Sequence, residues 1–221
     1  MLKINLQFFG GRGASSGSKG YATGGANPNN ISNRTSMISE RGNKPNEVDD
    51  ALKVLREVQG EYGVIVNDLQ IAKMSGADKN GTLAFYDAGG NLAVNENYFD
   101  LGKLNQSYDE DVQAGFHPSR GNKSAMEAVV AHEMGHRLTD EAGNIAGNGF
   151  WSLDKTSNDI VSKASKTLGI SHGELRSRIS GYAKSSNAET VAEAFADMYC
   201  NGNNASSASR AVINELSKYF D

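Results

Sequence analysis

Residues 127–143 read EAVVAHEMGHRLTDEAG, and within this stretch His132 and His136 stand four positions apart. On an α-helix, residues four apart differ by about 40° in azimuth, so both imidazoles project from one face, one turn apart. Two rings placed in this way can bind one metal ion at about 2.0–2.1 Å. Glu133 would lie about 100° round the helix. There, beside the metal, its carboxylate can take a proton from water as a general base.

The same stretch predicts a helix with two distinct faces. Four apolar residues recur at helical spacing on the side away from the histidines: Met126, Val130, Met134 and Leu138. The helix is expected to begin near Asn122, because Ser124 and Glu127 have the spacing of a capping box. The pattern therefore predicts a core face and a cleft face that carries the histidines. The alternative is an ordinary amphipathic helix with two exposed histidines.

A catalytic zinc site needs a third protein ligand and leaves its fourth position open for water. The metzincin spacing would require glycine at 139 and histidine at 142, where this chain has Thr139 and Ala142. The other two histidines, His117 and His172, do not stand in a recognisable ligand context. A carboxylate from another segment is therefore favoured as the third ligand.

Residues 185–200, SSNAETVAEAFADMYC, supply the candidate carboxylates, with Glu189, Glu193 and Asp197 four apart on a predicted helix. Such a ladder of like charges is mildly destabilising unless a cation compensates it. We favour Glu189 as the third ligand; the alternative is a capping box with Ser186. Glu193 is placed to accept a hydrogen bond from a ligating histidine and fix its tautomer, unless it only belongs to a solvated acidic face. Asp197 is the weakest of the three candidates.

Two motifs resemble the catalytic core of gluzincin metallopeptidases of the anthrax lethal factor and Pro-Pro endopeptidase type. They are HEMGH at residues 132–136 and YAKSSNAETVAEAF at residues 182–195, with Tyr182 seven residues before Glu189 as in that family. The resemblance implies a zincin-like domain that hydrolyses peptide bonds with Zn²⁺. It also implies residue roles: zinc ligands His132, His136 and Glu189, general base Glu133, and Tyr182 as hydrogen-bond donor to the oxyanion. A phenol in that place would stabilise the transition state selectively.

A second resemblance concerns residues 4–17, INLQFFGGRGASSG, which are similar to the opening of proteins encoded by phages and mobile elements of Gram-positive bacteria. It implies a setting, either the cytoplasm of a bacterial host or the virion, and no particular activity. Two functions follow for comparison. One is a zinc-dependent endopeptidase acting on a protein or peptide substrate. The other is a structural or interaction protein of a phage particle, whose metal site is vestigial or purely structural.

Composition limits the class of protein. A chain of 221 residues, 38% apolar and 22% charged, is expected to fold as one domain with a substantial core. No apolar run approaches the roughly 18 residues that span a bilayer, and no classical signal peptide is recognisable, so we expect no membrane association. The single cysteine, Cys200, excludes an internal disulfide and a cysteine-based zinc cluster. We expect a monomer.

Charge and composition divide the chain near residue 45. Residues 1–44 contain six basic residues against one acidic residue, or about +5, which leaves about −9 for the remainder of a chain whose net charge is −4. Residues 1–45 are rich in Gly, Ser and Asn and are expected to form a flexible basic arm. Residues 46–221 are expected to form the zincin-like domain. Its acidity argues against nucleic acid as a partner.

The remaining pattern predicts an α+β fold, with a small sheet and hairpin before the site helix and a helical C-terminal half. The hairpin, around Gly89 and Gly90, either pairs with an extended substrate through its edge or simply completes the sheet. The expected segments are a helix over 47–63, a strand over 64–72, the hairpin over 82–95, a loop over 104–121, and helices near 155–168, 172–180, 187–200 and 207–219.

Overall fold

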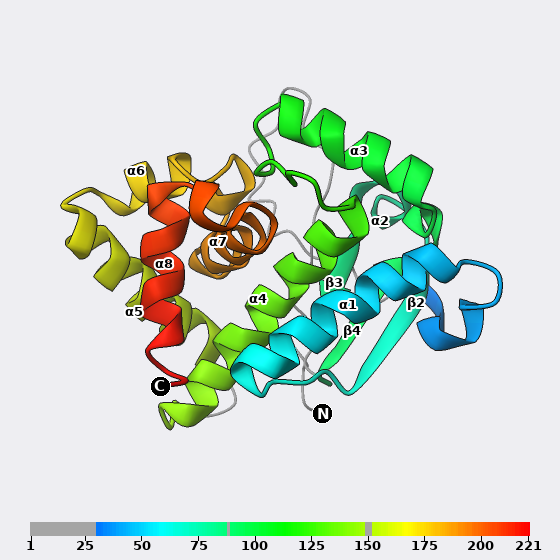
Figure 1. The fold of residues 1–221 in the computed structure, drawn as a ribbon, viewed down its shortest axis with the longest axis horizontal. Coiled ribbons are helices and arrows are strands. Elements are labelled where there is room, and N and C mark those ends of the chain that lie inside the picture. The colour runs from blue at the N-terminus through cyan, green and yellow to red at the C-terminus, as the bar shows by residue number, and fades with distance from the viewer. Residues whose placement is uncertain (1–29, 88, 149–151) are drawn as a thin grey trace.

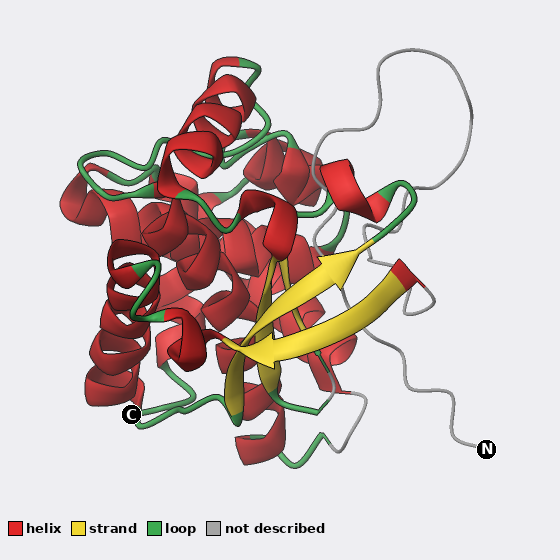
Figure 2. Ribbon diagram, turned by 90° about the vertical axis from the view of Figure 1, so that its right-hand side faces the viewer, coloured by secondary structure: helices red, strands yellow, loops and turns green. Residues whose placement is uncertain are grey.

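A computed structural model describes residues 30–87, 89–148 and 152–221 of the protein. These residues form eight α-helices and one four-stranded mixed sheet, which confirms the α+β class (Figure 1). Figure 2 shows the strands grouped on one side of the molecule, with most of the helices on the other.

The sheet has the strand order β1-β2-β4-β3. The two central strands, β2 (Asp68–Met74) and β4 (Asn91–Asn95), are parallel, whereas β1 (Ile31–Ser36) and β3 (Ala84–Tyr86) pair antiparallel to β2 and β4. Strands β3 and β4 pair antiparallel and confirm the predicted hairpin. Among the described residues, β3 is an edge strand of the sheet. The predicted strand over 64–72 is displaced, since β2 begins four residues later.

Both faces of the central strands are buried. On β2, Leu69 and Ile71 join the main hydrophobic core, while Ala72 and Met74 belong to a second cluster. Successive side chains on a strand point to opposite faces, so these two pairs mark the two sides of the sheet. A strand buried on both sides gives no clear alternation of apolar and polar residues, which explains why the predicted strand begins too early.

The structure differs from the expected arm over residues 30–45. Strand β1 and the 3₁₀ helix η2 (Met37–Glu40) form there, so regular structure begins about 15 residues before the predicted domain boundary at 46. The cause is pairing with distant residues: β1 is hydrogen-bonded along β2, and the Arg34 guanidinium forms an ion pair with the buried Asp87 carboxylate. Residues 1–29, including the phage-like stretch, lie outside the described residues.

Helix α1 (Pro45–Tyr62) confirms the first predicted helix. Proline occupies its first turn, where no backbone donor is required, and Gly63 ends it with a left-handed φ of 69°. On its inner face Val48 and Val58 are buried, whereas Leu52 and Leu55 are only partly buried.

The predicted loop over 104–121 is wrong for its first half, because α3 spans Leu101–Gln113. Asp100 caps this helix by accepting a hydrogen bond from the Lys103 backbone N–H at 3.1 Å. Ser107 and Asp111 lie on its buried face beside apolar residues, so the periodicity of the apolar residues is incomplete. Residues 114–121 contain no helix or strand, as expected.

Helix α4 (Ala125–Ile145) runs between α1 and the C-terminal helices and contacts α1, α5, α7 and β3 (Figure 1). The four helices predicted after it are present, although the second is shorter than expected. They are α5 (Ser152–Leu168), α6 (His172–Ser177), α7 (Asn187–Asn201) and α8 (Ser207–Ser217). Short elements complete the described residues: α2 (Asp78–Gly81), η3 (Glu96–Tyr98), η4 (Tyr182–Lys184) and η5 (Gly202–Asn204).

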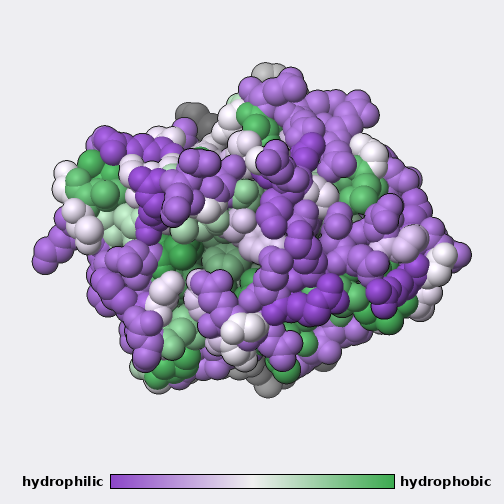
Figure 3. Space-filling model, in the orientation of Figure 1, coloured by the Kyte–Doolittle hydropathy of each residue, from purple (hydrophilic) through white to green (hydrophobic). Residues whose placement is uncertain are grey.

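The surface in the orientation of Figure 1 is mainly hydrophilic, with scattered hydrophobic areas (Figure 3). Three large apolar side chains are strongly exposed among the described residues, Ile38, Ile65 and Ile145, and they come from three different segments. Isolated apolar residues of this kind are normal on a protein surface. None of the described helices combines the length and the hydropathy that a membrane span requires.

Candidate metal centre

Helix α4 carries His132, Glu133 and His136 at its middle. It begins as predicted: the Ser124 hydroxyl accepts from the Glu127 N–H at 3.1 Å, and the Glu127 carboxylate accepts from the Ser124 N–H at 2.9 Å. The predicted apolar stripe is fully buried, but so is the face that bears the histidines. The expected cleft face is thus buried in this structure, and the site lies in the interior.

Helix α7 crosses α4 at very close range, and Gly135 makes this possible. A Cβ atom built on Gly135 would lie 2.7 Å from the Ala192 Cα and 3.1 Å from the Phe195 Cβ. Any larger residue would therefore force the two backbones apart. Because Gly135 stands next to His136 and Ala192 stands next to Glu193, this contact sets the distance between the two halves of the site.

We expect Gly135→Ala to lower the free energy of unfolding by about 1–3 kcal/mol, the range typical of overpacking. It should also weaken metal binding, since α7 must shift. Gly60→Ala on α1 is the matched control, because a Cβ there meets nothing within 4 Å. That change should be neutral or stabilise by up to about 1 kcal/mol. Chemical denaturation of both variants measures the difference, and equal stabilities would contradict the role given to the close approach.

Three nitrogen and oxygen atoms from the two helices converge at one point. The distances are 3.2 Å between the Nε2 atoms of His132 and His136, and 3.0 Å and 3.3 Å from these atoms to Oε2 of Glu189. With bonds of about 2.0–2.1 Å, tetrahedral geometry places two zinc ligands about 3.3–3.4 Å apart. The observed triangle is close to that spacing, so this buried group can hold a metal ion.

The protonation pattern supports a cation at this point. The His132 Nδ1 lies 2.7 Å from a carboxylate oxygen of Glu193, which can only accept, so Nδ1 carries the proton. In a neutral ring Nε2 is then an acceptor, yet it faces the Glu189 carboxylate at 3.0 Å. Two acceptors repel one another unless a positive charge lies between them. Either an extra proton or a metal ion satisfies the arrangement, and a metal ion fits all three atoms.

The carboxylate of Glu189 faces the histidines and does not cap its own helix. The Ser186 hydroxyl accepts a hydrogen bond from the Glu189 backbone N–H at 3.0 Å, so Ser186 caps α7, but the Glu189 carboxylate does not complete the capping box that was the alternative. The Glu189 side chain is left for His132 and His136. Burial acts to raise the pKa of Glu189, but the His136 and His132 rings outweigh it and lower the pKa to about 2. Glu189 is therefore held as an anion.

Glu193 hydrogen-bonds the Nδ1 atom of His132, the ring nitrogen that faces away from the triad, as the sequence suggested. Its Oε1 accepts from His132 Nδ1 at 2.7 Å and faces His117 Nδ1 at 3.0 Å, and its Oε2 accepts from the Ser180 hydroxyl at 2.7 Å. Burial alone would raise the pKa of Glu193, but the two imidazoles lower it to about 2. The contact between His117 and Glu193 could not be predicted from the sequence, because the loop that carries His117 contains no local pattern that indicates it.

Glu133 is fully buried beside the triad. Among the described residues, neither oxygen of its carboxylate has a hydrogen-bond partner. Burial, and then the charge of Glu189, raise the pKa of Glu133 well above its usual range, while the backbone of Tyr86 on β3 acts in the opposite direction. A buried carboxylate without donors is costly, which makes Glu133 a candidate for proton transfer and not for structural support.

Tyr182 lies next to the site at the start of η4. Its side chain is buried, and its ring centroid is 6.0 Å from that of His132. The backbone N–H groups of Gly181 and Tyr182 donate to the Gly115 and Phe116 carbonyls at 2.8 Å and 2.9 Å. The turn that carries Tyr182 is therefore fixed to the loop that carries His117.

Asp197 and His172, which were also considered as metal ligands, lie outside the group that can hold a metal. Asp197 accepts hydrogen bonds from the Asn201 amide, the Ser206 N–H and the Ser209 hydroxyl at 2.8 Å, 2.9 Å and 2.6 Å. It therefore organises the turn between α7 and α8. His172 is half-buried in the first turn of α6, outside the group that can hold a metal.

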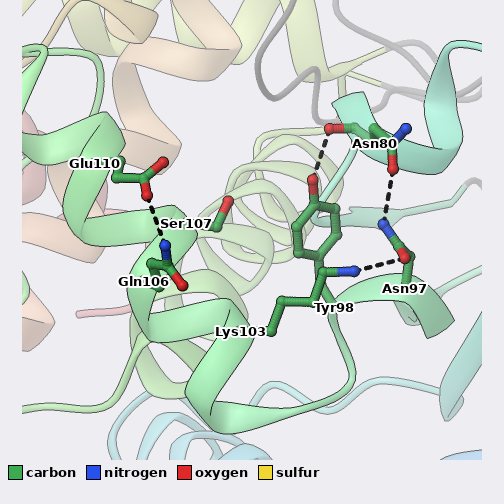
Figure 4. Close-up of a pocket in the computed structure, with 7 residues that line it drawn as sticks. All are labelled: Asn80, Asn97, Tyr98, Lys103, Gln106, Ser107 and Glu110. Carbon is green, nitrogen blue, oxygen red and sulfur yellow. Dashed lines mark hydrogen bonds between the residues drawn. The ribbon is translucent and has the colours of Figure 1, made fainter.

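A polar hollow of about 420 Å³ lies between α2, η3 and α3, away from the triad (Figure 4). Most of its polar side chains are already paired. Lys103 donates to Asn97 at 2.7 Å, and Asn97 donates to Asn80 at 3.0 Å. Ser107 is buried there without a partner among the described residues. The hollow contains none of the candidate site residues.

Comparison with known proteins does not assign this arrangement to a family, since no family model, curated protein or solved structure gives a significant match to the chain.

Proposed function

We propose that this protein is a zinc-dependent endopeptidase. The observation that carries the proposal is the convergence of His132, His136 and Glu189 beside Glu133, whose carboxylate has no hydrogen-bond partner among the described residues. A purely structural metal site is served by ligands alone and has no use for a buried carboxylate at its side. The two motifs that resemble gluzincins supply the same four residues.

The donor set supports zinc in particular. Two imidazole nitrogens and one carboxylate oxygen are the ligands of several catalytic zinc sites, and they leave the fourth position open. The residues that would hold the ion are His132, His136 and Glu189. Zinc bound there would supply a Lewis acid that polarises a peptide carbonyl and lowers the pKa of water to about 7.

Glu133 would transfer protons, and Tyr182 would stabilise the negative charge that develops during the reaction. The Glu133 carboxylate would accept a proton from the attacking water and deliver it to the leaving amine. The Tyr182 hydroxyl would donate a hydrogen bond to the oxyanion that develops on the carbonyl oxygen. Because these side chains are buried, the entry of a peptide requires part of the surrounding structure to move aside.

The test is metal analysis combined with cleavage profiling on a peptide library. We expect one zinc per purified chain, and cleavage that a chelator abolishes and added zinc restores. The same assay would reveal the substrate preference. A protein that binds zinc but cleaves nothing in the library would favour the alternative, a phage-particle protein with a structural metal site.

A further inference from the structure

His117 is the one described histidine that reaches the site without belonging to the converging triad. Its side chain is fully buried, and its Nδ1 lies 3.0 Å from the same Glu193 oxygen that accepts from His132. Two rings from different segments therefore share one carboxylate oxygen. The third donor, the Ser180 hydroxyl, holds the other oxygen at 2.7 Å.

The surroundings of His117 fix its ring in place. It is stacked on Tyr108 of α3, with centroids 5.1 Å apart and planes at 5°, and it meets Tyr182 edge-on at 5.7 Å. The loop next to it is joined to the Tyr182 turn by the backbone hydrogen bonds of Gly115 and Phe116. His117 thus connects three elements around Glu193: α3, η4 and α7.

The metal-facing position of His132 depends on this arrangement. If the Glu193 carboxylate rotates, His132 loses the acceptor that keeps its proton on Nδ1 and directs the lone pair of Nε2 toward the His136 and Glu189 side chains. Outer partners of this kind orient ligating histidines, and their removal typically costs about 10–100-fold in metal affinity. His136 has no equivalent support, since its Nδ1 lacks a partner among the described residues.

We propose that His117 is a positioning residue for the metal centre, which acts through Glu193 to orient the His132 ring. This role rests on the proposed function only in requiring a metal ion at the triad. It extends the site to a residue outside both recognisable motifs. His117 lies outside the three residues that can hold the metal, so metal binding is the direct test of its role.

The test compares His117→Phe, which keeps an aromatic ring on Tyr108, with His117→Asn, whose amide N–H can replace the Nδ1 donor. Zinc affinity is measured by competition with a chromogenic chelator, and coordination by the visible absorption of the Co²⁺-loaded protein. We expect His117→Phe to weaken zinc binding about 10-fold and to alter the cobalt spectrum. His117→Asn should stay within about threefold of the unmodified protein. His172→Phe is the matched control and should change neither quantity.

Three results would overturn the role. His117→Phe with unchanged affinity and spectrum would show that His117 only packs. Equal losses in the Phe and Asn variants would show that the hydrogen bond is irrelevant. Should His117→Phe not fold, NMR of the unmodified protein decides: His117 and His132 should each give a downfield Nδ1–H signal, and the absence of the His117 signal overturns the proposal. An unmodified protein that binds no metal would instead contradict the proposed function itself.

Discussion

Glu133→Gln should lower kcat for peptide cleavage by about 10²–10⁴-fold, the usual contribution of a general acid–base group, and leave the zinc content unchanged. Glutamine has the same shape but cannot accept the proton. The metal ligands should be undisturbed, because Glu133 is not among the three converging residues. Steady-state kinetics and metal analysis on the same preparation separate the two quantities.

The same variant makes an independent prediction about stability. Glu133 is fully buried, its carboxylate has no hydrogen-bond partner among the described residues, and burial raises its pKa. In the metal-free protein, either the charge or the uptake of a proton therefore costs stability near neutral pH. Glu133→Gln should therefore raise the melting temperature of the metal-free form. Glu141→Gln, on the same helix but paired with Arg137 at 2.9 Å near the surface, is the control and should keep its activity. Undiminished cleavage by Glu133→Gln would end the catalytic role proposed for this residue.

The balance of charge supports the proposal that a cation binds at the site. Three buried carboxylates meet within it, from Glu133, Glu189 and Glu193. Only Glu193 is fully supplied with donors, by His132, His117 and Ser180. Glu189 faces the Nε2 atoms of His132 and His136, and the His132 Nε2 is an acceptor when its ring is neutral. The Glu133 carboxylate has no hydrogen-bond partner in the described part of the chain. A divalent ion at the triad would offset this excess of negative charge.

Much of the site could be predicted because, on a helix, the spacing of two residues in the sequence determines whether they lie on the same face. His132 and His136 share a face of α4 for that reason, and Glu189 and Glu193 share a face of α7. The capping box at Ser124 marked the start of α4 within a few residues. What spacing cannot give is the approach of two helices. The convergence of α4 and α7 depends on Gly135, whose role becomes visible only once Ala192 lies against it.

Local sequence patterns do not predict the elements whose structure depends on distant partners. Residues Ile31–Ser36 read ISNRTS, a polar stretch that becomes a strand because β2 offers it hydrogen bonds. Helix α3 was missed because Ser107 and Asp111 interrupt its apolar face. His117 was left without a role because its partner, Glu193, is 76 residues away. These are contacts that local periodicity cannot encode.

The second large effect is expected on zinc binding when Glu189, the proposed third ligand, is replaced. Glu189→Ala should weaken zinc binding by more than about 100-fold, which exceeds the loss typical of an outer partner. It removes one corner of the triangle and leaves two imidazoles facing one another at 3.2 Å. Cleavage activity should fall with the zinc content. Zinc affinity is measured by chelator competition, at a temperature where the variant is folded.

Asp197→Ala is the informative comparison, because Asp197 lies two turns further along the same face of α7. It accepts three hydrogen bonds at the turn before α8, so its loss should lower the free energy of unfolding by about 1–3 kcal/mol by leaving buried donors unpaired. Zinc affinity in the folded protein should stay near that of the unmodified chain. One variant would thus lose metal and the other stability. Equal losses of zinc in both would mean that the metal is bound by a different set of carboxylates.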